Sequence, residues 1–284
     1  MSQQYKTDII RALDIKKHLN FMEDEVILAC RRIQMMLYDD LIDEDVVEKK
    51  IGNIKSSSNN QNVKAVAKLL SSVLRQCTVE KSEQKHETSL IIESLQPFIF
   101  SCVISRIKDI KFEWMTYHLV PPSGHPNNQT MLPDLVLYAD PISKMNYELF
   151  FVEVKRKGNF ANGHLESDIV KLGKEMQIAI NKLILRKVKC PEVVGLLVEG
   201  YVATAYKMDL KFNGQYRMVE ISKFNFTCNS VGDIMLVPTI MEKLYQIQAI
   251  ISETLQSLYN SFDDIEESED TTSLLQLLVE VLLQ

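Results

Sequence analysis

Two carboxylates and one lysine in the middle of the chain have the types and spacing that phosphate chemistry requires. Asp134 lies near the start of an apolar segment, LPDLVLYAD, and Glu153 and Lys155 end a second one, YELFFVEVK. If these segments form a hairpin with its turn centred between residues 143 and 144, facing residues have numbers that sum to 287, so Asp134 falls opposite Glu153. Lys155 follows Glu153 by two residues, which places it on the same face of the strand.

Two carboxylates that face each other repel unless a positive charge compensates them. A magnesium ion can do so, because it binds one or two carboxylates and leaves its other positions to water and substrate phosphate. Lys155 is then placed to hold an attacking water or to stabilise charge that develops on the phosphate. The alternative interpretation is a structural Asp–Lys–Glu ion cluster at the edge of the sheet, since strand registers shift easily by one or two residues.

A helix, three strands, a second helix and a fourth strand are predicted around these residues. The first helix covers about 87–106 and carries one apolar stripe, formed by Ile91, Leu95, Phe98 and Cys102. The elements after it are three strands at about 112–120, 132–139 and 148–155, a helix at about 167–187 and a strand in VVGLLVEG. This succession predicts an α/β fold with a mixed central sheet.

Helical regions are predicted on both sides of this core. Residues 1–80 have helical periodicity with a polar break at 56–61. Within the core, 81–237, a further hairpin is expected at about 201–227, with its turn at Asn213-Gly214. The C-terminal region, 238–284, is expected to hold helices separated by an acidic linker. The terminal helices are also the candidate surface for a homo-oligomer.

Composition and charge limit the possible function classes. The chain of 284 residues is 46% hydrophobic and 25% charged, as in ordinary globular proteins. Its net charge of −6 argues against a protein that coats nucleic acid by charge alone, but ten Lys and Arg against five Asp and Glu lie between residues 144 and 190. The nine glycines form no phosphate-binding loop, and the five histidines show no metal-ligand spacing.

The sequence also bears on the compartment. The start, MSQQYKTDII, has no signal-peptide pattern, and the strongest apolar run, 274–283, is too short to span a membrane. The cysteines are odd in number and far apart, which indicates neither a disulfide framework nor a zinc site: Cys30, Cys77, Cys102, Cys190 and Cys228. We therefore expect an intracellular protein of the nucleus or cytoplasm, neither secreted nor attached to a membrane.

Pro133-Asp134, followed after a strand and a turn by Glu153-Val154-Lys155, resembles the signature of the PD-(D/E)XK nucleases. The predicted order of elements is also similar to the common core of that superfamily, the restriction-endonuclease-like fold. The resemblance covers about 87–210. It implies that Asp134 and Glu153 bind magnesium or manganese, and that Lys155 positions or activates water.

The resemblance implies further site residues on the two helices. Members often have an acidic residue in the first helix, and Glu87 extends the buried stripe whereas Glu93 points away from it. A helix N-terminal acid is the alternative interpretation of Glu87. A Gln or Lys near the site is common on the second helix, where Gln177 and Lys174 are found. The Gln-then-Tyr pair of one subgroup is absent, because Asn181 is the fourth residue after Gln177.

These observations predict a magnesium- or manganese-dependent nuclease that hydrolyses phosphodiester bonds in DNA, with RNA as the alternative substrate. Arg156, Lys157 and Lys174 are the candidate contacts to nucleic-acid phosphates, although Arg156 and Lys157 at a strand end also fit plain solvation. Two other classes remain open. One is a nuclease fold that has lost cleavage and binds nucleic acid or protein, and the other is an interaction protein in which the carboxylates are structural.

Overall fold

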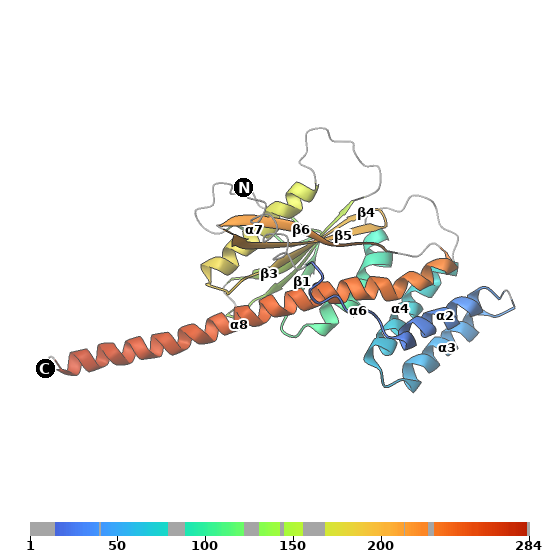
Figure 1. Ribbon diagram of the computed structural model, residues 1–284, viewed down its shortest axis with the longest axis horizontal. Coiled ribbons are helices and arrows are strands. Elements are labelled where there is room, and N and C mark those ends of the chain that lie inside the picture. Colours follow the sequence, from blue (N-terminus) through green and yellow to red (C-terminus); the bar gives the residue numbers. More distant parts are fainter. Residues whose placement is uncertain are drawn as a thin grey trace, which may run out of the picture.

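The chain forms a six-stranded mixed sheet with helices on both faces and a layer of helices at one end (Figure 1). The computed structural model describes residues 15–39, 41–78, 89–121, 131–142, 145–155, 168–212, 214–226 and 230–282. The mixed α/β class predicted from the sequence is confirmed.

The N-terminal layer consists of three helices, α2 (Asp24–Leu37), α3 (Glu44–Ser57) and α4 (Gln61–Thr78). In α2, the residues at helical spacing that are buried include Val26, Ala29, Cys30 and Ile33. The polar break predicted at 56–61 is confirmed as the connection between α3 and α4. There the side chain of Asn60 accepts a hydrogen bond from the backbone N–H of Asn62 at 2.8 Å and so caps the start of α4.

The first helix of the predicted core is divided into three pieces. A π-helical turn, η1 (Leu90–Leu95), is followed by α6 (Gln96–Cys102) and a 3₁₀ turn, η2 (Ile104–Arg106). The apolar stripe is confirmed, because all four of its members are buried: Ile91, Leu95, Phe98 and Cys102. All four belong to the main apolar core, and α6 contacts the C-terminal helix.

The sheet has the strand order β1-β2-β3-β4-β5-β6. Only β3 and β4 are parallel, and all other neighbours are antiparallel. The six strands are β1 (Lys111–Trp114), β2 (Leu135–Ala139), β3 (Tyr147–Lys155), β4 (Val193–Glu199), β5 (Val202–Phe212) and β6 (Gln215–Asn225). The hairpin expected at about 201–227 is therefore confirmed.

The first strand is shorter than the predicted 112–120. It ends at Trp114 because the next residue, Met115, has φ of 59°, in the left-handed region that breaks an extended strand. Beyond it, the Met115 N–H donates to the Asp134 carbonyl at 2.9 Å, and Leu119 and Met131 form an isolated bridge.

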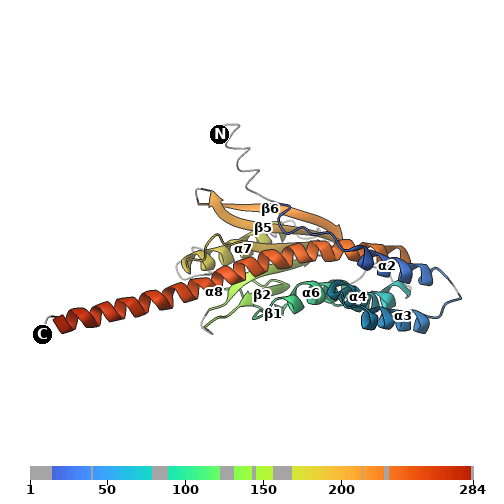
Figure 2. The same cartoon turned by 60° about the horizontal axis from the view of Figure 1, so that its bottom comes forward.

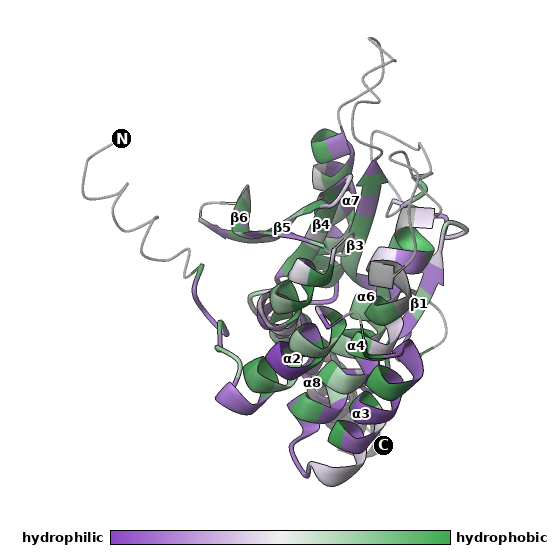
Figure 3. Cartoon of the chain, turned by 90° about the vertical axis from the view of Figure 1, so that its right-hand side faces the viewer, coloured by the Kyte–Doolittle hydropathy of each residue, from purple (hydrophilic) through white to green (hydrophobic). Residues whose placement is uncertain are grey.

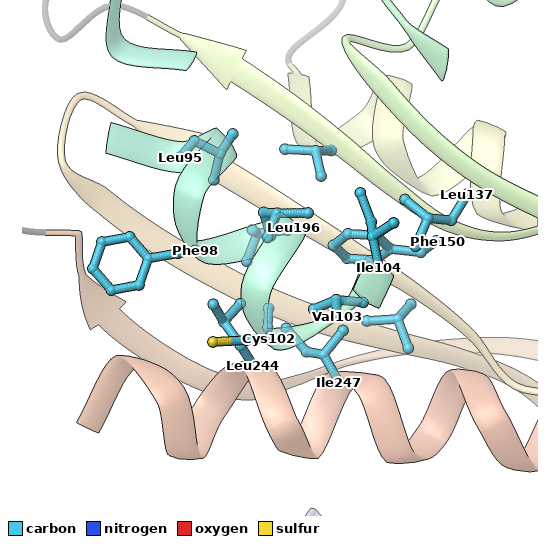
Figure 4. Close-up of a cluster of buried hydrophobic side chains, with 14 of the residues drawn as sticks. Leu95, Phe98, Cys102, Val103, Ile104, Leu137, Phe150, Leu196, Leu244 and Ile247 are labelled. Atoms are coloured by element: carbon cyan, nitrogen blue, oxygen red, sulfur yellow. The ribbon is translucent and has the colours of Figure 1, made fainter. Parts of the chain in front are cut away.

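The two faces of the sheet are covered by different helices. Helix α7 (Asp168–Leu185) connects β3 to β4 and lies along both strands, which are rich in hydrophobic residues (Figure 3). It approaches closely at Gly195, where a Cβ atom would stand 2.7 Å from the Met176 sulfur. On the opposite face, α6 lies between the sheet and α8 (Val237–Leu282), with Phe150 and Leu196 facing it (Figure 4).

The C-terminal region is a single helix, so the predicted separation of several helices by an acidic linker is wrong. Helix α8 runs through the acidic residues 263–270 and protrudes from the body of the molecule (Figure 2). After Pro238 at its second position it contains no proline or glycine, and glutamate favours helix, so nothing in the sequence ends it. The segment Val231–Asp263 would pass as a membrane span by length and composition, but 56% of the apolar window is buried in the protein, as in a core helix.

Candidate active site between β3 and α7

The predicted hairpin register, in which facing residue numbers sum to 287, is confirmed at the end of β2 next to Asp134. Leu135 pairs with Val152 and Leu137 with Phe150, and both pairs sum to 287. Continuing this register by one residue brings Asp134 opposite Glu153. Asp134 is half-buried, and its Oδ2 accepts a hydrogen bond of 2.7 Å from the backbone N–H of Val154.

Helix α7 adds two charged side chains to this pair. The Lys171 ammonium donates to both carboxylate oxygens of Glu153, at 2.7 and 2.8 Å, and to the carbonyl of Leu132 at 2.8 Å. Its distance to the nearer oxygen of Glu175 is 3.7 Å. Glu153 is 3% exposed and Glu175 is fully buried. We call Asp134, Glu153, Glu175 and Lys171 the β3–α7 cluster.

Burial makes the charged forms of the two glutamates unfavourable. It raises the pKa of Glu153 to about 7, with the Asp134 carboxylate adding to the rise and Lys171 opposing it. Burial and then the Glu153 carboxylate raise the pKa of Glu175 to about 9. Burial alone would lower the pKa of Lys171, but the surrounding carboxylates outweigh it and raise that pKa. Glu175 therefore holds a proton at neutral pH in the absence of another cation.

Lys155 lies on the predicted face of β3, the face covered by α7. Its ammonium makes an ion pair of 3.0 Å with Asp168, the first residue of α7, and its side chain is 40% exposed. Lys155 thus stands at the solvent side of the β3–α7 cluster. This location agrees with the predicted access of Lys155 to water or a phosphate.

The other predicted site residues are placed as follows. Gln177 is half-buried and follows Glu175 by two residues, about 200° around the helix, so it does not share the face that carries Lys171 and Glu175. Lys174 is half-buried on the flank of that face. Glu87, Arg156 and Lys157 lie outside the residues that the structure describes.

Sequence reasoning missed Asp168, Lys171 and Glu175. A signal for Glu175 exists, since it lies three residues after Leu172 and four before Ala179, within the apolar stripe that packs on the sheet. Asp168, Lys171 and Glu175 are separated by three and four residues, which places them on one face of a helix. A carboxylate in an apolar stripe is therefore the feature that predicts an inward-facing site residue here.

A second ion pair fixes α7 to the other end of β3. The Lys182 ammonium donates a hydrogen bond to Oε1 of Glu148 at 2.6 Å, and the Tyr117 hydroxyl donates to the same oxygen. Glu148 and Glu153 both face α7 although five residues separate them, because β3 has one extra residue, Leu149, between the pairs Leu137–Phe150 and Tyr138–Glu148. This bulge changes the sum of facing residue numbers from 287 to 286. Lysines at both ends of α7 are thus paired with glutamates of β3, and these pairs hold the helix in place.

The charged groups at the opposite end of the sheet are more fully compensated. Glu192 has both Lys207 and Lys211 as partners, at 3.3 and 2.6 Å. Asp209 accepts two hydrogen bonds from Arg217, at 2.8 and 2.7 Å. Because each carboxylate there has at least one cation in direct contact, this region is a structural network rather than a candidate catalytic site.

The donor chemistry of the β3–α7 cluster suits a hard divalent cation. When all three carboxylates are ionised, they carry three negative charges around the one positive charge of Lys171, and no N–H or O–H donor of the described residues contacts either oxygen of Glu175. Carboxylate oxygens are the ligands that magnesium and manganese prefer. As the side chains stand, no three His, Cys, Asp or Glu residues of the described segments are arranged to hold a metal ion, and the Lys171 ammonium lies among these carboxylates.

Comparisons of the chain with protein-family models, with curated proteins and with solved structures found no match.

Proposed function

We propose that this protein is a magnesium- or manganese-dependent nuclease with a restriction-endonuclease-like core. The observation that carries the proposal is the β3–α7 cluster, in which three carboxylates gather around the Lys171 ammonium at the end of a buried strand. Buried carboxylates in excess are unfavourable for folding, and a catalytic role explains why the site keeps them. The order of the described elements, helix, three strands, helix and a parallel fourth strand, supports the same proposal.

Asp134, Glu153 and Glu175 would hold the metal ion. A divalent ion bound there would polarise the phosphate and lower the pKa of a bound water. The Val154 N–H, which donates to Oδ2 of Asp134, would hold that carboxylate in place at the metal. Lys155, on the solvent side, would hold the water or stabilise negative charge on the phosphate. Glu175 replaces Glu87 as the third acid in this proposal because its position is set by α7.

The proposed substrate is DNA, with RNA as the alternative. The segment 144–190, which has an excess of basic residues, contains Lys155 and Lys174. Arg156 and Lys157 follow β3 directly in the sequence, so the C-terminal end of this strand is rich in cationic residues that could bind phosphates. Gln177 is not assigned a role in catalysis, because it lies on a different face of α7. The intracellular location, the absence of membrane attachment and a homo-oligomer through the terminal helices stay predictions.

A nuclease fold that binds nucleic acid or protein without cleaving is the second candidate function. The observation that favours it is the close contact of Lys171 with both oxygens of Glu153, which compensates one of the carboxylates without a metal ion. In that case the cluster would stabilise the fold, as the Glu148–Lys182 pair does. The two functions differ in whether added metal produces cleavage.

The test is incubation of the purified protein with labelled single- and double-stranded DNA and RNA, with magnesium, manganese or EDTA. Metal-dependent cleavage by the parent protein, abolished in Asp134→Ala, supports the nuclease. The matched control is Asp140→Ala, which changes an aspartate at the other end of β2 that pairs with Lys111. Absence of cleavage on all four substrates with either metal would reject the nuclease, and cleavage undiminished in Asp134→Ala would reject this site.

A further inference from the structure

We infer that Lys171 occupies the metal position in the metal-free protein, and that metal binding moves its ammonium away from Glu153 and towards the substrate phosphate. The inference rests on the proposed function and assigns Lys171, which lies outside the Asp134, Glu153 and Lys155 motif, a positioning role at the same site.

The contacts of Lys171 show why it must move. Both oxygens of Glu153 accept from this one ammonium, at 2.7 and 2.8 Å. Glu153 is 3% exposed, so a metal ion cannot approach it from an open side. A magnesium ion would need an oxygen of Glu153 at about 2.1 Å, which an ammonium in direct contact with both oxygens prevents. Metal ligation by Glu153 therefore requires Lys171 to leave at least one oxygen.

The surroundings of Lys171 also show where the ammonium can go. The side chain is 29% exposed, while the carboxylates of Glu153 and Glu175 below it are buried. Its third acceptor is the carbonyl of Leu132, a residue that is 49% exposed. The ammonium thus lies at the boundary between the buried carboxylates and the surface. A divalent ion among the carboxylates would repel it outward, to the side from which a phosphate approaches.

The ion pair at the other end of α7, between Lys182 and Glu148, is a structural pair and has a different environment. The Lys182 side chain is 9% exposed and that of its partner Glu148 is fully buried. Lys182 has no comparable route to the surface, and only one other donor, the Tyr117 hydroxyl, contacts Glu148 among the described residues. Lys182 is therefore the matched control for Lys171, on the same helix and paired with the same strand.

The experiment measures manganese affinity by isothermal titration calorimetry for the full-length parent, Lys171→Met and Lys182→Met. If Lys171 competes with the metal, Lys171→Met binds manganese at least about tenfold more tightly, because no ammonium has to be displaced. Lys182→Met should bind manganese with the affinity of the parent. Lys171→Gln keeps a hydrogen-bond donor without the charge, and it should also bind more tightly, so the test does not depend on the folding of the methionine variant.

Manganese affinity that is unchanged or weaker in both Lys171 variants would overturn the inference. This result is distinguishable from failure of the proposed function. Cleavage by the parent with unchanged affinity in the variants would leave the nuclease standing and reject the displacement of Lys171. Tighter metal binding by the variants in a protein that cleaves no nucleic acid would support the displacement and reject the nuclease.

Discussion

Replacing Glu175 with glutamine should stabilise the metal-free protein, and the gain should increase with pH. Glu175 is fully buried, and no N–H or O–H donor of the described residues contacts its oxygens. Burial, followed by the Glu153 carboxylate, raises its pKa from 4.5 to about 9. Glutamine has nearly the shape of the protonated glutamate, but it needs no proton to be neutral.

The sign and size follow from proton linkage. A carboxyl group with a raised pKa in the folded state contributes its full stability below the pKa of the unfolded chain, and this contribution is lost as pH rises through the folded-state pKa. Between about pH 5 and pH 9, unfolding releases one proton from Glu175, so the free energy of unfolding falls by about 1.4 kcal/mol per pH unit. At pH 7 the loss amounts to roughly 3 kcal/mol, and Glu175→Gln should recover it.

Urea unfolding in EDTA at pH 5, 6, 7 and 8 measures this gain. Glu175→Gln should differ from the parent by about 1 kcal/mol or less at pH 5 and by about 3 kcal/mol or more at pH 7 and above. Glu48→Gln changes an exposed glutamate of α3 and is the control. A gain that does not change with pH, or a variant less stable than the parent at pH 8, would refute the assignment of a buried carboxyl group with a raised pKa.

Three further predictions concern the site and the helix that carries it. Asp134→Asn should abolish metal-dependent cleavage while the melting temperature in EDTA stays close to that of the parent, since the amide oxygen still accepts the backbone hydrogen bond; residual cleavage near the parent rate would contradict this. Lys155→Ala should slow single-turnover cleavage on the order of 100-fold. Lys174→Ala should instead weaken nucleic-acid binding, measured in calcium, in a salt-dependent way. Equal losses of affinity in both variants would contradict the water-positioning role of Lys155. Lys182→Met should lower the free energy of unfolding by about 3–5 kcal/mol, because it leaves Glu148 buried without a cation. If urea denaturation at pH 7 shows a decrease below about 1 kcal/mol, the Lys182–Glu148 pair is not needed for stability.

The register of the β2–β3 hairpin was predictable from the sequence, while the residues that α7 adds to the β3–α7 cluster were not. Register in a hairpin follows from a period of two and a short turn, so Asp134 and Glu153 could be paired by counting. The bulge at Leu137 and Tyr138 was not predicted, but it lies on the turn side of the pair and leaves this register intact. It does turn Glu148 towards α7, which counting alone would have placed on the other face.

Lys171 and Glu175 could not be chosen from the sequence because a helix has several polar faces, and only packing decides which one meets the sheet. Gln177 and Lys174 were chosen by resemblance, whereas the stripe of buried residues brings Lys171 and Glu175 inward. Strand length failed at Met115, where a local backbone conformation ended β1 without a glycine or proline to indicate it. Long-range packing and local backbone conformation were therefore the two missing pieces of information.

Metal binding at the β3–α7 cluster is tested most directly by an anomalous difference map from crystals of the protein soaked in manganese. We expect one peak within ligand distance of the carboxylates of Asp134, Glu153 and Glu175, with the Lys171 ammonium withdrawn from Glu153. Crystals of Glu175→Gln should show a weaker peak or none. A map without a peak at this position, with Lys171 still in contact with both oxygens of Glu153 at saturating manganese, would contradict the assignment of a metal-dependent site.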